Sequence, residues 1–387
     1  MNIPRRPEDG EAARRYAAYD HLAATVLAPR QVRSESVLPG VLTIIKRTKR
    51  TSFLLSEGNS LANSFPRKSK DVRVLPACPS GDVGRWPVVR FRPQSMHYCA
   101  SCLPNWGVDM YSAEISRANP TCFVFLLDQS ASMQDPIGSG EGQRKCDVVA
   151  DALNRLLSEL TIKCAKEEGV RDYFHVSVIG YGGSNVGPAL TGPLAGRDLV
   201  PLSEVAASPA KLEARSKKVP DGAGGLVEQE VKFPVWVNPV ASGGTPMSQA
   251  LTRAQSVVSG WLNEHPACFP PVVLNLTDGE ANDGDPTNPA EAVRQLASAD
   301  GPVLLFNLHV SSDGSAPISF PDNDAALPNE YARSLFGMSS NLPDHMRTYA
   351  QQQGITVSEG TRGFVFNADI TSIVQFLDIG TRASDLR

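Results

Sequence analysis

Residues 122–133 read CFVFLLDQSASM, an apolar run of strand length that ends abruptly in the carboxylate of Asp128. Two hydroxyls follow at alternate positions, Ser130 and Ser132. A short apolar run bounded by turn residues is typical of a strand buried on both faces of a sheet. The stretch therefore predicts a central strand whose carboxyl end carries a group of oxygen atoms.

Two later segments have the same character. Residues 243–246 read GGTP, a glycine turn in which Thr245 opens a helix, and residues 272–279 read VVLNLTDG, a second buried strand that ends at Asp278. Each segment has a structural explanation of its own, because threonine followed by proline commonly opens a helix and aspartate followed by glycine commonly makes a turn. Ligands bind beyond the carboxyl ends of strands in open α/β sheets, so the two aspartates predict one shared site.

The D-x-S-x-S pattern at Asp128, the later threonine and the later aspartate together resemble the metal-ion-dependent adhesion site of von Willebrand factor A (vWA) domains. The resemblance covers about residues 121–382. It implies a Rossmann-like α/β fold, with a mostly parallel central sheet and helices on both faces. One departure from the family pattern is Ala131, where glycine is usual; alanine fits there only if its φ is negative.

The resemblance also implies the ligands of the ion, which are Asp128, Ser130, Ser132, Thr245 and Asp278. Mg²⁺ demands near-octahedral oxygen coordination and usually keeps several waters. Hydroxyls supply oxygens without cancelling the charge of the ion, and the aspartates of the family act largely through bound water. We therefore expect Mg²⁺ or Mn²⁺, with an open position that accepts a carboxylate from a protein partner.

Within that family the chain is most similar to bacterial cytoplasmic proteins of the TerY type, which are associated with tellurium-resistance and related stress loci. Such proteins are often encoded beside a metal-dependent protein phosphatase and a Ser/Thr kinase-like protein, which become the expected partners. The implied function is a non-enzymatic module for metal-dependent protein–protein interaction.

Composition agrees with a globular protein that is not anchored in a membrane. The chain has 387 residues, of which 41% are hydrophobic and 20% charged, so it is long enough to bury a sizeable core. No apolar stretch near the start is long enough to span a bilayer, and no secretory signal pattern opens the chain. Seven cysteines, an odd number without disulfide-scaffold spacing, favour reduced thiols and a cytoplasmic location.

Charge divides the chain into two parts. Residues 1–109 hold 17 of the 37 basic and 9 of the 41 acidic residues, a net charge of +8, so the remaining residues carry −12. We interpret residues 1–109 as a basic extension that is poorly ordered, or as a gene-model artefact with initiation at Met110. The alternative is a genuine basic domain that covers the sheet or binds a partner. Its short basic clusters lack a stacking platform, which argues against nucleic acid.

Residues 119–383 alternate between strand and helix patterns, as expected for one vWA domain with an insertion at about residues 184–230. The insertion is rich in Gly, Pro and Ala and weakly patterned. The periodicity predicts strands over 173–181, 231–240, 271–277, 303–310 and 364–367, and helices over 145–168, 246–264, 329–335 and 343–353, with others opening at residues 288 and 370.

Two other classes of function are alternatives. A serine hydrolase would use Ser130 or Ser132, but the G-x-S-x-G pattern is absent and no histidine lies in the three segments. A zinc-dependent nucleic-acid module would use His97, Cys99 and Cys102, with Cys78 as a further candidate, but a second Cys-x-x-Cys or a pair of histidines is missing. The acidic residues after Asp278 do not match a calcium loop and predict a solvated rim: Glu280, Asp283 and Asp285.

Overall fold

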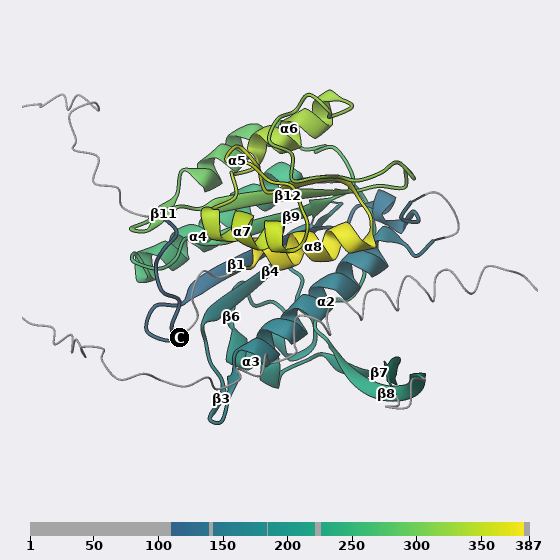
Figure 1. The fold of residues 1–387 in the computed structure, drawn as a ribbon, viewed down its shortest axis with the longest axis vertical. Coiled ribbons are helices and arrows are strands. Elements are labelled where there is room, and N and C mark those ends of the chain that lie inside the picture. The colour runs from purple at the N-terminus through teal and green to yellow at the C-terminus, as the bar shows by residue number, and fades with distance from the viewer. Residues whose placement is uncertain (1–109, 139–141, 184, 221–225, 383–387) are drawn as a thin grey trace, which may run out of the picture. The chain divides into compact units, whose positions relative to one another are not determined.

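The computed structural model describes residues 110–138, 142–183, 185–220 and 226–382 (Figure 1). The basic extension expected over residues 1–109 lies outside the described residues, as do the cysteines and histidine of the zinc alternative. The described part is an α/β unit with a central, mostly parallel sheet between helices. This confirms the predicted fold class.

The central sheet has the order β13-β14-β12-β9-β1-β4-β5, and β6 also pairs with β4. Its five inner strands run parallel to one another and the three short strands at its edges run antiparallel. The inner strands are β1 (Thr121–Asp128), β4 (Phe174–Gly182), β9 (Val272–Thr277), β12 (Leu304–Val310) and β14 (Phe364–Ala368); the edge strands are β5 (Asn185–Pro188), β6 (Val200–Pro201) and β13 (Ile318–Ser319).

Strand β1 lies at the centre because every one of its residues is apolar or satisfied within the protein. All eight residues are buried, which a parallel strand covered on both faces requires. Its alternate side chains enter different clusters, Phe123 and Phe125 on one face and Val124 and Leu126 on the other. The register sets Leu127 beside Leu276, so β1 and β9 end together.

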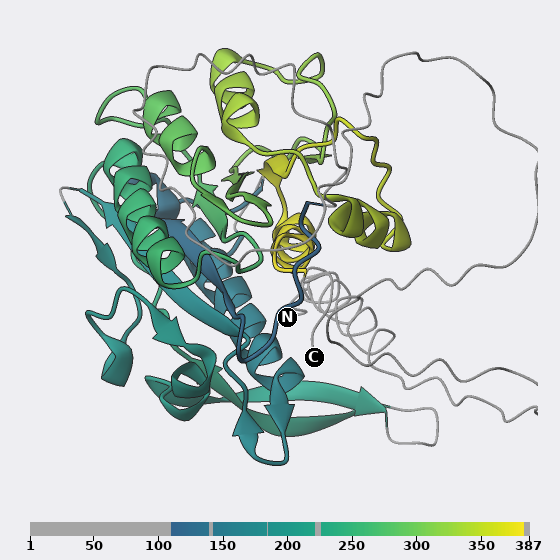
Figure 2. The same cartoon turned by 90° about the vertical axis from the view of Figure 1, so that its left-hand side faces the viewer.

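Helices cover both faces of the sheet, as Figures 1 and 2 show. One face packs against α2 (Lys145–Lys163), α3 (Leu202–Ala207), α7 (Asp344–Gln352) and α8 (Ile370–Gly380), and the other against α4 (Met247–Glu264), α5 (Thr287–Arg294) and α6 (Glu330–Met338). Among the described residues, no helix combines the length and the hydrophobicity needed to cross a membrane.

The helices and inner strands agree with the periodicity to within a few residues, apart from α2, which ends at Lys163. The exception among the strands is the one predicted over 231–240. Strand β8 (Leu226–Val235) ends earlier and pairs with β7 (Lys211–Pro220) in a separate antiparallel hairpin, not with the central sheet. Residues 236–240, which lead toward the threonine turn, form no strand. The prediction failed because apolar content alone does not reveal the partner of a strand.

The remaining elements are short. They are the 3-10 helices η1 (Ala131–Gln134) and η2 (Gly192–Leu194), and the hairpins of β2 (Ala165–Lys166) with β3 (Gly169–Val170) and of β10 (Ala297–Ser298) with β11 (Gly301–Pro302). Helix η1 positions the site loop, because it begins directly after Ser130.

Candidate functional site

The first candidate residue, Asp128, is the last residue of β1 and is almost completely buried, with 2% of its surface exposed. Its Oδ1 accepts a hydrogen bond of 2.8 Å from the backbone of Ser130, and its Oδ2 accepts one of 2.7 Å from the Thr277 hydroxyl. Burial is the main cause that raises the pKa of Asp128 to about 6, and these hydrogen bonds oppose the shift. Asp128 thus fixes the loop after β1 to the end of β9.

The two serines and Asp278 lie side by side. The Ser130 and Ser132 hydroxyls are 3.1 Å apart, and Ser132 donates a hydrogen bond of 2.8 Å to Oδ1 of Asp278. Ser130 is buried, whereas Ser132 is exposed. The structure therefore brings three of the predicted residues into hydrogen-bonding range at the surface end of the sheet.

Thr245 reaches this group through a close approach of two glycines. Gly243 has a φ of +73°, and a Cβ at this position would lie 2.3 Å from the Cα of Gly183. A backbone hydrogen bond of 2.9 Å from Ala131 to Gly243 holds the turn against the loop after β1, and one of 2.9 Å from Gly183 to Gly244 holds it against the end of β4. A methyl group built at Gly279 would lie 3.8 Å from Thr245 Oγ1 and 4.0 Å from Ser132 Oγ. The two hydroxyls therefore flank Gly279.

Ala131, the departure from the family pattern, fits its position. It begins η1, and it is not one of the non-glycine residues with positive φ. The alanine side chain is exposed. The backbone at this position therefore does not require glycine.

Lys145, the first residue of α2, lies beside the candidate residues and was not predicted from the sequence. Only 5% of this residue is exposed, and its Nζ donates a hydrogen bond of 2.9 Å to Oδ2 of Asp278, whose side chain is fully buried. The signal was present in the spacing, because Lys145, Val149 and Leu153 recur every four residues and share the inward face of the helix.

The geometry suits an ion of the size of Mg²⁺. With Mg–O distances of about 2.0–2.1 Å, neighbouring oxygens of an octahedron are about 2.9 Å apart. The Ser132 hydroxyl lies 3.1 Å from that of Ser130 and 2.8 Å from Oδ1 of Asp278, close to this spacing, and the Ser130 hydroxyl lies 3.5 Å from the same Oδ1. Over the described ranges no group of three or more His, Cys, Asp or Glu could hold a metal. An ion here would be held by hydroxyls together with Asp128 and Asp278.

A buried chain of hydrogen bonds lies in the sheet beside this site, and it too was not predicted from the sequence. The Tyr181 hydroxyl donates to Asn275 at 2.7 Å, Asn275 donates to Asn307 at 3.0 Å, and Asn307 donates to Ser339 at 3.0 Å. Tyr181 is the register partner of Asp128. The chain satisfies polar groups across β4, β9 and β12, which favours one packing of these strands.

The acidic residues after Asp278 have structural roles. Asp283 accepts hydrogen bonds from the backbone of Ser248 and Gln249 in the first turn of α4, at 3.1 and 2.9 Å. Asp285 accepts from the backbone of Thr287 at 2.9 Å, where α5 begins. Both carboxylates therefore satisfy orphan amides at helix starts, in addition to contributing to an acidic rim.

His309 is a core residue, as its place in an apolar strand suggests. Its ring stacks on Phe366 with centroids 4.5 Å apart, and its Nδ1 accepts a hydrogen bond of 3.3 Å from the backbone of Asn367. Burial lowers the pKa of His309 to about 4. Among the described residues, no histidine makes a hydrogen bond to Ser130 or Ser132, so the serine-hydrolase alternative gains no support.

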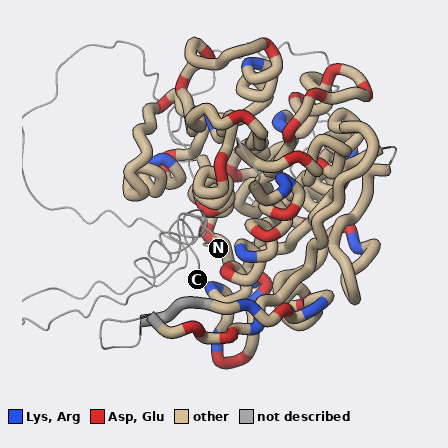
Figure 3. The backbone as a smooth tube through the Cα atoms, turned by 90° about the vertical axis from the view of Figure 1, so that its right-hand side faces the viewer, with Lys and Arg blue, Asp and Glu red and all other residues tan. Residues whose placement is uncertain are grey.

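Charges of both signs are interspersed along the described chain, as Figure 3 shows. The ion pairs on the surface are mostly local, such as Arg144 with Asp147 at 2.6 Å and Arg197 with Glu204 at 2.9 Å. This arrangement does not favour nucleic acid, which selects a continuous basic stripe.

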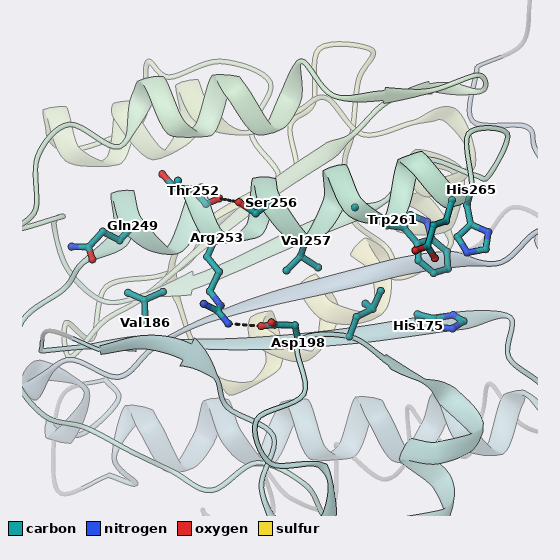
Figure 4. Close-up of a pocket in the computed structure, with 13 residues that line it drawn as sticks. His175, Val186, Asp198, Gln249, Thr252, Arg253, Ser256, Val257, Trp261 and His265 are labelled. Carbon is teal, nitrogen blue, oxygen red and sulfur yellow. Dashed lines mark hydrogen bonds and ion pairs between the residues drawn. The ribbon is translucent and has the colours of Figure 1, made fainter.

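A groove of about 780 Å³ lies along α4, apart from the five candidate residues (Figure 4). Arg253 of α4 forms an ion pair of 2.5 Å with Asp198 across it, and Trp261 lies between His175 and His265, with centroid distances of 4.8 and 3.9 Å. Neither feature has the spacing of a catalytic or metal-binding arrangement.

Comparison with known proteins gave distant structural matches only. No family model matches the chain, and no curated protein matches it. The vWF domain of the type V pili tip protein Mfa5 from Porphyromonas gingivalis is 15% identical, with a TM-score of 0.23, over 42% of this chain and 39% of that one. The pilus adhesin RrgA from Streptococcus pneumoniae is also 15% identical, with a TM-score of 0.23, over 42% of this chain and 21% of that one.

A further match is the adhesive tip pilin GBS104 from Group B Streptococcus agalactiae. It is 13% identical, with a TM-score of 0.21, over 63% of this chain and 72% of that one. The chain spans less than half the length of the Mfa5 and RrgA structures. At such TM-scores the matches carry no argument about the site or about function.

Proposed function

We propose that this protein is a non-enzymatic, vWA-like module that binds Mg²⁺ or Mn²⁺ and uses the ion to dock a carboxylate of a protein partner. The proposed ligands are Asp128, Ser130, Ser132, Thr245 and Asp278. The observation that carries the proposal is their convergence. Segments at residues 128–132, 243–245 and 278, the first more than a hundred residues before the other two, meet at one sheet edge, where the oxygens of Ser132 lie 3.1 Å from Ser130 and 2.8 Å from Asp278.

Asp128 and Ser132 would have different roles, the first in supporting the loop and the second in binding. Both oxygens of Asp128 are engaged by hydrogen bonds from the loop and from β9, so Asp128 would hold the loop in place and act on the ion over a longer range. Ser132 is exposed, so the site would open to solvent on its side. When bound, the ion would supply the positive charge that attracts an anionic group.

The cellular system in which the protein acts is part of the same proposal. A cytoplasmic stress or tellurium-resistance system of the TerY type, with a protein phosphatase and a kinase-like partner, follows from the sequence resemblance. Its support is the order and spacing of the site residues, and co-purification with those two proteins would test it.

Thermal melting of the full-length protein with and without Mg²⁺ tests whether the proposed site binds the ion. A ligand that binds only the folded state stabilises it by RT ln(1 + L/Kd), where L is the concentration of free ligand, and so raises Tm as that concentration increases. Mg²⁺ should raise the Tm of the wild type and of an Asp324→Ala control, whose carboxylate is exposed in another loop. It should not raise the Tm of Asp128→Ala or Asp278→Ala. An equal shift in all four proteins would mean that Mg²⁺ binds elsewhere.

A further inference from the structure

The buried lysine beside the site is energetically unfavourable. Lys145 is 5% exposed, and its ammonium contacts Asp278 at 2.9 Å and the backbone oxygen of Ser132 at 3.4 Å. The next carboxylate, that of Asp135, is 4.0 Å from Nζ and mostly exposed to solvent. Burial of a charge costs free energy, and a cation in the first turn of a helix opposes the helix dipole. An apolar residue would cover this face of α2 at less cost.

The carboxylate of Asp278 is divided between two kinds of partner. Its Oδ1 faces the serine hydroxyls and its Oδ2 faces the lysine. A cation bound at Oδ1 would therefore share one carboxylate with a fixed ammonium. The two positive charges repel one another, and this repulsion weakens binding of the ion.

The lysine also changes the charge that an ion would leave behind. Asp128 and Asp278 carry two negative charges when ionised, so a divalent ion alone would neutralise them. With Lys145 present, one positive charge remains in excess. A site with surplus positive charge attracts an anion more strongly than a neutral site does.

On the basis of the proposed function, we infer that Lys145 is a positioning residue that lowers the affinity of the site for the metal ion and raises the affinity of the loaded site for the partner carboxylate. It holds Asp278 in place, weakens the bound ion and leaves the loaded site electropositive. The two effects have opposite signs, which distinguishes this role from a structural one. If Lys145 only braced α2 against the loop after β9, its loss would lower stability without tightening the metal.

Calorimetric titration of Mg²⁺ into the full-length protein tests the first effect. Lys145→Met and Lys145→Gln should bind Mg²⁺ roughly tenfold more tightly than the wild type, because a unit charge a few ångströms away is removed. Lys166→Met is the matched control, since Lys166 is an exposed lysine in the β2–β3 hairpin. Its affinity should equal that of the wild type. Unchanged or weaker binding in both neutral variants would overturn the inference.

The second effect is tested with acetate as the carboxylate probe. The titrations are repeated in sodium acetate and in sodium chloride at equal ionic strength. If acetate binds only to the site that holds Mg²⁺, it increases the apparent Mg²⁺ affinity of the wild type. The increase is at least about twofold once the acetate concentration exceeds the dissociation constant of acetate from the loaded site. Both neutral variants should lose this response. Absence of the response in the wild type would overturn the inference even if neither variant folds.

The two proposals fail in different ways. Wild-type protein that does not bind Mg²⁺, or binds it equally after Asp278→Asn, contradicts the metal site itself. Wild-type protein that binds Mg²⁺ at this site, with neutral Lys145 variants that retain the acetate response, contradicts only the role given to the lysine.

Discussion

The Thr277 hydroxyl donates a hydrogen bond of 2.7 Å to Oδ2 of Asp128 and so joins the ends of β9 and β1. Both residues are buried, with Thr277 fully so. The same hydroxyl is 3.1 Å from the carbonyl oxygen of Gly279 and 3.3 Å from its amide nitrogen. One side chain therefore supports the carboxylate of one segment and the turn after Asp278.

Thr277→Val should destabilise the protein, because valine has the shape of threonine but leaves a buried carboxylate with one partner fewer. The expected loss is about 1–3 kcal/mol of unfolding free energy, the usual cost of an unsatisfied buried polar group. Urea unfolding in EDTA measures it without a contribution from metal. Thr252→Val, at an exposed site on α4, should cost less than about 1 kcal/mol; equal losses in the two variants would show that the hydrogen bond is not responsible.

Asp128 should make the metal-free protein less stable as pH rises through the acid range. Its pKa is about 6 in the folded protein and near 3.8 when unfolded. Between these values the folded state keeps a proton that the unfolded state has released, so stability falls as pH rises and the full cost is present above the folded pKa. Asp128→Asn removes this cost. Its stability relative to the wild type should therefore rise between pH 4 and pH 6 and then level off.

Urea unfolding of both proteins in EDTA at several pH values checks this dependence. Only the difference between variant and wild type is compared, because His309, with a pKa lowered to about 4, contributes a slope of opposite sign. A difference that does not vary with pH would contradict the assigned pKa shift.

Gly243→Ala should disrupt the site more than its size suggests. The added Cβ would lie 2.3 Å from the Cα of Gly183. The alanine backbone would also have to adopt a φ of +73°, which is unfavourable for residues other than glycine. We expect loss of Mg²⁺-dependent stabilisation because the turn that carries Thr245 has to move. Gly260→Ala, in α4 with open space around it, should keep the full Mg²⁺ response; thermal melting compares the two, and a normal response in Gly243→Ala would refute the role of this turn.

Much of this site was readable from the sequence because its residues end continuous apolar strands. Asp128 and Asp278 follow apolar runs of strand length, and parallel strands end at the same edge. The spacing places Lys145 on the inward face of α2, but its burial could not be read from the sequence, because a charged residue at the start of a helix is normally solvated. Its burial depends on Asp278, which is 133 residues away in the sequence.

The hairpin of β7 and β8 shows a second limit of sequence reasoning. Residues 226–235 and 211–220 mix charged and apolar side chains without a single buried face, so neither periodicity nor composition fixes the pairing. The structure pairs Lys211 with Val235 and anchors the hairpin to α2 through an ion pair of Arg215 and Asp151 at 2.5 Å. Such contacts between distant segments are not local properties of the chain.

Partner capture should depend on the divalent ion. A protein partner that offers a carboxylate to the site should bind in Mg²⁺ or Mn²⁺ and be released by EDTA. Thr245→Ala should fail to capture it, whereas Thr252→Ala, at an exposed threonine within α4, should capture it normally. A partner that remains bound to Thr245→Ala in EDTA would be recognised by another surface.

The most direct measurement is calorimetric titration of Mg²⁺ into the full-length wild type, Asp278→Asn and Ser132→Ala. Asparagine keeps the shape of Asp278 and can still accept a hydrogen bond from Lys145, and Ser132 is exposed, so both variants should fold. The account predicts saturable binding of one ion to the wild type, no detectable binding to Asp278→Asn and weakened binding to Ser132→Ala. The same binding isotherm in all three proteins would contradict it.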